Sequence, residues 1–222
     1  SRAKVAPQEV GHVVFGNVIH TEPKDMYLSR VAGINGGIPK EVPALTLNRL
    51  CGSGLQAIVS AAQIVALGDA DVAVAGGAES MSRSNYWIPS ARWGAKMGDQ
   101  KMMDSMVGAL SDPFHEIHMG VTAENVAKQY GIGRDEQDEF SVESHKRAAN
   151  AIKNGYFKDQ ILPIEIKDRK GVRVFDTDEH VRTDVSMENL AKLRPAFQKD
   201  GSVTAGNASG LNDGAAAVVL MD

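Results

Sequence analysis

The sequence has little of several residue types. It holds one cysteine, Cys51, so no intrachain disulfide can form. This excludes a disulfide-stapled secreted scaffold and fits a reducing compartment, so we expect a cytoplasmic protein. Aromatic residues are only 5% of the chain, too few for a base-stacking surface. The net charge of −4 provides no basic footprint for nucleic acid or for an anionic membrane.

Long apolar runs are also missing. No stretch reaches the roughly 18 residues that a membrane span needs, and no charged segment followed by an apolar one opens the chain. With 43% hydrophobic residues, however, the chain can bury a real core. We therefore expect a folded protein that binds neither nucleic acid nor membrane. The chain starts without Met and stops inside an apolar run, so we also expect it to be cut at both ends.

Strands and helices alternate through the first third of the chain. Apolar runs predict strands at 12–19, 43–47 and 71–76, and an amphipathic pattern predicts a helix at 25–32. A long helix that follows Gly54 and runs to about Leu67 is apolar nearly all round, which is typical of a helix buried between layers. Strand, helix and strand at this spacing indicate a βαβ unit with a parallel sheet.

The character of the sequence changes after Ser82. Residues 83–120 hold both tryptophans, five of the nine methionines and few periodic segments. An irregular segment of this length is usually functional or an interface. We expect a layered α/β domain formed by 1–82 with 211–222, interrupted by an inserted α/β lobe at 83–210.

Helical patterns return inside this inserted lobe. They predict helices at 122–130 and 135–154, and the second is rich in charged residues, as a solvated helix is. A loop of Gly, Ala, Ser and Asn follows at 202–213, and the apolar run at 215–221 predicts a closing strand.

Cys51 is the sharpest chemical feature. It lies between a predicted strand and the N-terminus of the apolar helix, with Gly52 and Gly54 close behind. Unpaired N–H groups and the helix dipole favour a thiolate there, and the strand–turn–helix placement resembles the nucleophile elbow of hydrolases. The glycines would let a substrate approach the backbone, and the Cys51 N–H could stabilise an oxyanion. A lone thiol is also commonly a buried structural residue, so both interpretations stand.

Other motifs are weaker. The glycine pair at 76–77 lacks the spacing of a dinucleotide-binding loop, and the 205–210 stretch is either an ordinary turn or a surface for a long ligand. His115 and His118 are too sparse for a metal site, although His118 could donate to a substrate carbonyl. Basic residues at 167–170 are typical of solvated surface, whereas Arg182 could meet a phosphate.

Five stretches are informative when taken together, namely Asn48–Ala57, Gly76–Ser82, His118–Asn125, Ala191–Phe197 and Thr204–Gly214. In order and over essentially the whole chain, they resemble the thiolase family, especially its bacterial β-ketothiolases and acetyl-CoA acetyltransferases. The resemblance implies a thiolase-like layered fold, of which this chain is an incomplete N-terminal βαβ half with an inserted loop domain. The opening strand and helix of the family fold are absent before residue 1.

The resemblance also implies an activity. Cys51 matches the nucleophile that takes an acyl group from a CoA thioester, for condensation of two acetyl-CoA or for thiolysis of a short-chain 3-ketoacyl-CoA. CoA thioesters are then the substrates, with no further cofactor and no metal. The family assembles as homodimers or homotetramers, for which 83–98 matches a contact region, and works in fatty acid or polyhydroxyalkanoate metabolism.

Further substrate-binding residues follow from the same match. Ser209 matches a contact to the pantetheine arm and Arg182 a basic contact near the CoA nucleotide end. His118 and Met119 match pocket residues around the acyl and thioester end. Leu110, Ala205 and Phe197 match positions along the same cleft.

The chain departs from the family in one important respect. The family's Asn-Glu-Ala-Phe, Gly-His-Pro and Cys-x-Gly-Gly-Gly motifs, which supply an oxyanion-hole Asn, an activating His and an acid/base Cys, do not occur here. Loss of a positioned acid or base commonly costs about 10²–10⁴-fold in rate. We therefore expect the isolated chain to be nearly inactive. A non-catalytic CoA-binding or assembly role is the alternative, and the condensing enzymes of fatty-acid and polyketide synthesis are a more distant one.

Overall fold

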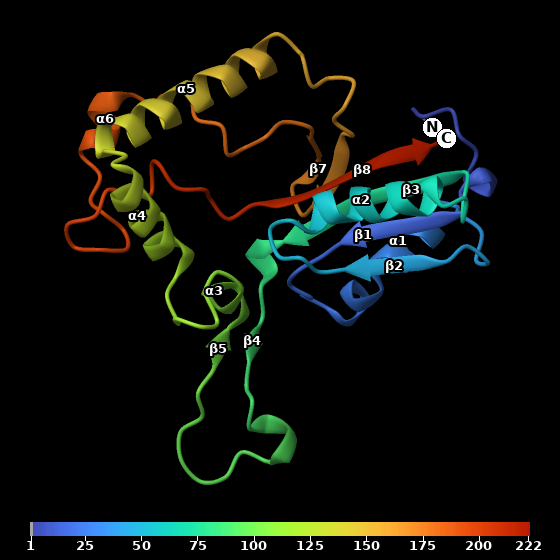
Figure 1. Cartoon of the computed structure of the whole chain (residues 1–222), viewed down its shortest axis with the longest axis horizontal. Coiled ribbons are helices and arrows are strands. Elements are labelled where there is room, and N and C mark those ends of the chain that lie inside the picture. The colour runs from blue at the N-terminus through green and yellow to red at the C-terminus, as the bar shows by residue number, and fades with distance from the viewer. Residues whose placement is uncertain (1) are drawn as a thin grey trace. The chain divides into compact units, whose positions relative to one another are not determined.

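The structure is a computed structural model that describes residues 2–222 (Figure 1). The chain forms two compact units, one made of the residues up to 111 together with 211–222 and the other of 112–210. The expected inserted lobe also ends at 210 but starts at 83, whereas 83–111 makes its contacts within the first unit. The domain boundaries inferred from the sequence remain a prediction.

The first unit is built on a four-stranded sheet in the order β2-β1-β3-β8. Its strands are β1 (His12–Gly16), β2 (Ala44–Leu47), β3 (Val72–Ser80) and β8 (Asp213–Met221). The first three are parallel, as the βαβ pattern predicts, and β8 pairs with β3 in the antiparallel direction along the whole of its length. The sheet is therefore mixed.

The sheet has an apolar cluster on each of its two faces. Val14, Ala73 and Ala75 pack with Ala57 and Ala61 of α2 (Ser53–Ala66). On the opposite face, Val13, Phe15 and Val72 form a second cluster, against which Leu28 of α1 (Leu28–Asn35) packs. Because side chains along a strand alternate between faces, α1 and α2 cover opposite faces of the sheet.

The structure differs from the sequence expectations at two helices. The helix expected at 25–32 is a 3₁₀ turn at Pro23–Tyr27 followed by α1, because proline favours the start of a helical segment and fixes its first φ. Helix α2, expected to be buried all round, is covered only on its sheet-facing side. Leu55 is 69% exposed and Val59 41% exposed.

The irregular segment after Ser82 holds two short strands, β4 (Tyr86–Trp87) and β5 (Met103–Asp104), paired antiparallel, and then the short helix α3 (Ser105–Ala109). Trp93 and Met97, between the two strands, are exposed. Asp104 caps α3 by accepting hydrogen bonds from the N–H groups of Met106 and Val107.

The second unit combines three helices with one β-hairpin. It contains α4 (Met119–Tyr130), α5 (Arg134–Lys153), the hairpin of β6 (Ile164–Asp168) and β7 (Gly171–Phe175), and α6 (Met187–Ala191). Helix α4 ends at Tyr130 and is capped by Gly131, whose left-handed φ of +68° suits glycine. Across residues 2–222, no helix combines the length and apolar character needed to cross a bilayer.

Candidate functional site

Cys51 lies at the end of a tight turn that leads from β2 into α2. Leu50 adopts a left-handed φ of +47°, an uncommon conformation for a residue with a branched side chain. Such backbone strain of roughly 1–3 kcal/mol persists only where neighbouring groups enforce it. In a nucleophile elbow the nucleophile itself sits on the strained turn. Here the residue with the left-handed backbone is Leu50, one position before Cys51.

Two polar side chains hold this turn in place. Asn48 Oδ1 accepts a hydrogen bond from the Leu50 N–H at 2.8 Å. The buried Ser53 Oγ accepts from the Arg49 N–H at 2.9 Å and donates to the Leu50 carbonyl at 2.6 Å. The turn is thus closed from both sides, and Cys51 itself is exposed. The alternative of a buried structural cysteine is wrong for this structure.

Glycines bring the first turn of α2 directly onto the ends of two strands. A Cβ on Gly16, at the end of β1, would lie 2.7 Å from the Ser53 carbonyl carbon. A Cβ on Gly77 in β3 would lie 3.2 Å from the Gly16 carbonyl oxygen and 3.7 Å from the Gly54 Cα. This close approach places Cys51 near the carboxyl ends of the parallel strands, where open α/β sheets usually bind ligands.

A pocket of about 500 Å³ opens at this position, within the first unit. Its wall is mostly apolar and rich in small residues, and it includes Cys51 beside Leu110, the cleft residue expected from the family resemblance. The complete lining is Gly16, Val18, Ile19, Leu50, Cys51, Ser53, Gly54, Gly77, Ala78, Glu79, Met81, Ala109, Leu110, Gly214, Ala215 and Ala216. A pocket of this size and polarity suits a small organic group.

Glu79 is a pocket residue that the sequence did not point to. Its carboxylate accepts hydrogen bonds from the N–H groups of Val18 at 2.9 Å and Ile19 at 3.0 Å, and from Asn17 Nδ2 at 3.3 Å. It therefore holds the chain that leaves β1 against the end of β3. An acidic residue two positions after a glycine pair, near a strand end, is the signal that could have indicated it.

The remaining predicted substrate contacts lie in the second unit. His118 stacks on Phe197, with ring centroids 4.9 Å apart, and its Nδ1 accepts the Gly120 N–H at 3.0 Å as the N-cap of α4. Nδ1 is therefore the acceptor, which leaves Nε2 to carry the ring proton in the neutral imidazole. Met119 follows and is partly exposed. A single hydrogen bond thus orients the His118 ring.

Arg182 and Ser209 are both exposed. The Arg182 N–H donates to His145 Nδ1 at 3.1 Å, and its guanidinium lies 3.4 Å from the Asp184 carboxylate. The Arg182 side chain lowers the pKa of Asp184 below its usual value, first through its hydrogen bond. Because exposed ion pairs contribute little, the Arg182 guanidinium remains available to an anion.

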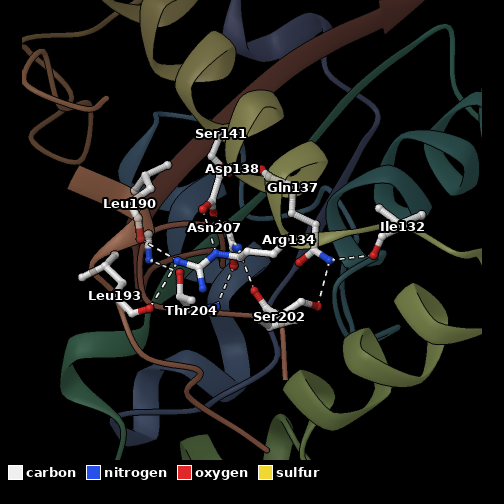
Figure 2. Close-up of polar contacts among 12 residues, drawn as sticks. Ile132, Arg134, Gln137, Asp138, Ser141, Leu190, Leu193, Ser202, Thr204 and Asn207 are labelled. Atoms are coloured by element: carbon white, nitrogen blue, oxygen red, sulfur yellow. Dashed lines mark hydrogen bonds and ion pairs between the residues drawn. The ribbon is translucent and has the colours of Figure 1, made fainter. Parts of the chain in front are cut away.

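A buried polar network supports the loop that carries Ala205 and Ser209 (Figure 2). Asp138 Oδ2 accepts from Arg134 Nε at 2.7 Å, and its Oδ1 accepts from Asn207 Nδ2 at 2.9 Å. Asp138 is 1% exposed, although the charged sequence of α5 predicted a solvated helix. The sequence carried no signal for this buried carboxylate, because one inward acidic residue does not change the overall pattern of a polar helix.

A second buried carboxylate, Glu124 of α4, serves the same loop. It accepts the N–H groups of Ser202 and Val203 at 2.8–3.0 Å, and the Ser202 hydroxyl at 3.1 Å. Burial raises the pKa of Glu124, but the hydrogen bonds from Ser202 and Val203 outweigh it and hold the pKa below its ordinary value of 4.5. The ionised form is therefore the one that stabilises the fold.

This arrangement predicts a specific loss of stability in acid. A carboxyl group whose pKa is lower in the folded than in the unfolded state stabilises the protein above the unfolded pKa, and that contribution is lost as the pH falls through the folded pKa. We expect the free energy of unfolding to fall as the pH drops below about 4.5. Glu124→Gln should lower it by about 1–3 kcal/mol at pH 7 and flatten this decline.

Urea unfolding of the natural full-length protein between pH 7 and pH 3, followed by circular dichroism, measures the effect. Glu139→Gln, an exposed carboxyl on α5, is the matched control and should reproduce the wild-type curve. An equally steep acid decline in Glu124→Gln and in wild type would contradict the assignment.

The chain is similar to known proteins over its whole length. The model of the thiolase N-terminal domain matches residues 1–222. The sequence is 67% identical over 223 residues to the beta-ketothiolase BktB of Cupriavidus necator, covering 100% of this chain and 57% of that protein. It is 52% identical to an acetyl-CoA acetyltransferase of Chromobacterium violaceum over 98% of this chain and 56% of that protein.

Solved structures give the same answer. The acetyl-CoA acetyltransferase of Bacillus anthracis superposes with a TM-score of 0.92 at 50% identity, over 98% of this chain and 55% of that one. Human mitochondrial 3-ketoacyl-CoA thiolase superposes with a TM-score of 0.94 at 46% identity, over 97% and 55%. The chain thus spans about half the length of the relatives it matches. Over all of its 222 residues, it belongs to the thiolase family and corresponds to the N-terminal domain of that family.

Proposed function

We propose that this chain is the nucleophile-bearing part of a thiolase-type acyltransferase. The observation that carries the proposal is the exposed Cys51 on the wall of a pocket of about 500 Å³, one residue before the N-cap of α2. The substrates are CoA thioesters, either two molecules of acetyl-CoA or a short-chain 3-ketoacyl-CoA with CoA. The related proteins carry names of this kind, acetyl-CoA acetyltransferase and 3-ketoacyl-CoA thiolase.

The chemistry proceeds in two steps. The Cys51 thiolate attacks the thioester carbonyl carbon, a new C–S bond forms, and the C–S bond to CoA breaks, so that CoA leaves as a thiolate that takes up a proton. In the second step another acyl-CoA loses an α-proton to a general base, its enolate carbon attacks the acyl-enzyme carbonyl, a C–C bond forms, and the acyl C–S bond breaks to release the Cys51 thiolate. In the thiolytic direction, Cys51 attacks the 3-keto carbon, the bond between the 2- and 3-carbons breaks, and the acetyl-CoA enolate that leaves takes up a proton. The CoA thiolate then attacks the acyl-enzyme, forms the new thioester and releases the Cys51 thiolate. The positive end of the α2 dipole faces the negative charge that develops beside Cys51.

The proposed substrate contacts are divided between the two units. In the first unit, Leu110 shares the pocket wall with Cys51. In the second, His118 with its Nε2–H and Met119 suit the acyl and thioester end, with Ala205 and Phe197 along the same cleft. Ser209 suits the pantetheine arm and Arg182 the nucleotide end. We also propose a homodimer or homotetramer, because exposed Trp and Met side chains cluster at 86–103.

Incubation with acetyl-CoA followed by intact-mass analysis tests the proposal. The natural full-length protein should gain the mass of one acetyl group, which peptide mapping should locate on Cys51. Free CoA should remove the adduct. Binding of CoA without any adduct would instead favour the alternative, a non-catalytic CoA-binding or assembly role.

A polypeptide of residues 1–222 alone is the second arm of this experiment. It should show almost no thiolysis of acetoacetyl-CoA, because each missing acid or base commonly costs about 10²–10⁴-fold. Rapid thiolysis by this polypeptide would overturn the assignment of further catalytic groups to motifs outside these residues.

A further inference from the structure

Two buried carboxylates in the second unit take no part in the proposed acyl transfer. Asp138 is 1% exposed and Glu124 is 6% exposed. Burying a charge is costly unless it is paired and hydrogen-bonded. Each carboxylate accepts hydrogen bonds from one short segment, the 202–209 loop, and the two carboxylates come from different helices, α4 and α5. The fold therefore commits two buried charges to the shape of a single loop.

Glu124 holds the entrance of the loop. Its two carboxylate oxygens together accept the consecutive N–H groups of Ser202 and Val203. Gly201 leaves room for this contact, because a Cβ there would lie 2.2 Å from Glu124 Oε1. Gln137 of α5 adds a hydrogen bond to the Ser202 hydroxyl at 2.9 Å. The start of the loop is thereby tied to both helices.

Asp138 holds the centre of the loop through Asn207. Asn207 Nδ2 donates to Asp138 and also to the Ser202 carbonyl at 3.0 Å, while its Oδ1 accepts the Thr204 N–H at 2.7 Å. One amide side chain thus bridges both ends of the loop from inside, as Figure 2 shows. The position of that amide depends on Asp138.

Arg134 completes the network and connects it to a neighbouring segment. Its Nε donates to Asp138, and its Nη2 donates to the carbonyls of Leu190 at 2.5 Å and Leu193 at 3.2 Å. Leu190 and Leu193 also press on the loop, because a Cβ on Gly206 would lie within 2.6 Å of both side chains. The Arg134–Asp138 ion pair therefore helps to hold both the loop and the 190–193 segment that packs against it.

The result is a loop with one face fixed inward and one presented outward. Val203 and Thr204 are buried, whereas Ala205 and Ser209 are exposed. Ala205 and Ser209 are the residues expected to contact the acyl-CoA. The buried network determines which groups of the loop remain free for a ligand.

We propose that Asp138, with Arg134 and Glu124, positions the 202–209 loop for acyl-CoA binding. None of these three residues lines the pocket at Cys51, so we assign them as positioning residues rather than catalytic ones. The inference rests on the proposed function only in identifying the ligand as a CoA thioester. A role in general stability alone would alter the unfolding transition without changing the affinity of the folded protein.

Asp138→Asn in the natural full-length protein is the decisive variant. It keeps the shape of the side chain but removes its negative charge. The amide of asparagine has only one oxygen, so it cannot accept hydrogen bonds from both Arg134 and Asn207 as the two carboxylate oxygens of Asp138 do. If only about one tenth of the folded molecules keep the loop in its binding shape, the Kd for CoA rises about tenfold, in inverse proportion to that fraction. Asp135→Asn, the same change at an exposed position of α5, should alter the Kd less than about twofold.

Two readouts separate positioning from stability. Titration calorimetry with CoA, at a temperature where both variants are folded, gives the Kd, and steady-state kinetics should show a raised KM with a kcat near wild type. Hydrogen exchange of the peptide that contains the Ser202, Val203 and Thr204 amides should be faster in Asp138→Asn without CoA. A Kd and an exchange rate equal to those of wild type would overturn the inference.

The outcomes also distinguish this inference from the proposed function. If the wild-type protein does not bind CoA, the proposed function fails, and the exchange of the loop amides then decides the positioning role alone. If Asp138→Asn does not fold, Asn207→Ala supplies the test. Asn207→Ala leaves the ion pair between Asp138 and Arg134 intact but removes the hydrogen bond that connects Asp138 to the loop. We expect the same tenfold rise in the Kd for CoA. An unchanged Kd would refute the inference.

Discussion

Replacing Cys51 by alanine is expected to lower acyl transfer by about 10⁴-fold or more, because without the nucleophile no acyl-enzyme can form. The fold should survive the change. Cys51 is exposed, and the turn around it is held by Asn48 and Ser53, whose hydrogen bonds do not involve the thiol. Rates of acetoacetyl-CoA thiolysis by the full-length protein measure the effect, with the thermal unfolding midpoint as the check on folding.

Cys51→Ser is the matched comparison. It replaces the thiol by a hydroxyl of similar size, but the hydroxyl is much less ionised than a thiol, so the variant should retain only a small residual rate. CoA binding should persist in both variants because the loop and pocket remain. Loss of a nucleophile leaves far less than about one hundredth of the wild-type rate. If Cys51→Ala retained more than this fraction, another group would have to accept the acyl group.

Gly16→Ala is expected to destabilise the protein by about 3 kcal/mol, at the upper end of the range for an overpacked core position. The new Cβ would lie 2.7 Å from the carbonyl carbon of Ser53 and 2.9 Å from its oxygen. These are backbone atoms of the first turn of α2, which cannot move aside as a flexible side chain can. The helix must retreat from β1, and Cys51 would move with it.

Urea unfolding of the full-length protein measures this cost, and Gly54→Ala provides the control. Gly54 also lines the pocket, but a Cβ there meets nothing within 4 Å. Because alanine loses less conformational freedom than glycine in a helix, Gly54→Ala should be neutral or stabilising by up to about 1 kcal/mol. An unfolding free energy of Gly16→Ala within about 0.5 kcal/mol of wild type, the range of an ordinary surface change, would show that α2 does not rest on β1 in this way.

The central βαβ unit could be predicted from sequence because its signals are local. The apolar runs that form β1 and β3 and the glycine-flanked start of α2 lie close to the predicted positions. The ends of the elements were less accurate. β3 runs on to Ser80 because β8 pairs with its whole length, a long-range contact that no local pattern reveals.

The candidate site was predictable in part for the same reason. The position of Cys51 between a strand and a helix is local, so the residues themselves predicted a thiol at a turn but left open whether that thiol is accessible or buried. Glu79, Glu124 and Asp138 could not be found in this way. Apart from Arg134, which lies four positions before Asp138, their hydrogen-bonding partners lie 60–79 positions away in the sequence. An isolated acidic residue looks like surface until such partners are known.

For protein engineering, the glycine and alanine wall of the pocket narrows the useful choices. Much of its lining is backbone, supplied by Gly16, Gly54, Gly77 and the start of β8, and a backbone wall cannot be trimmed by substitution. The larger apolar side chains that can be trimmed are few. A library that varies Ile19, Leu50, Met81 and Leu110 therefore samples most of the shapes this cavity can take.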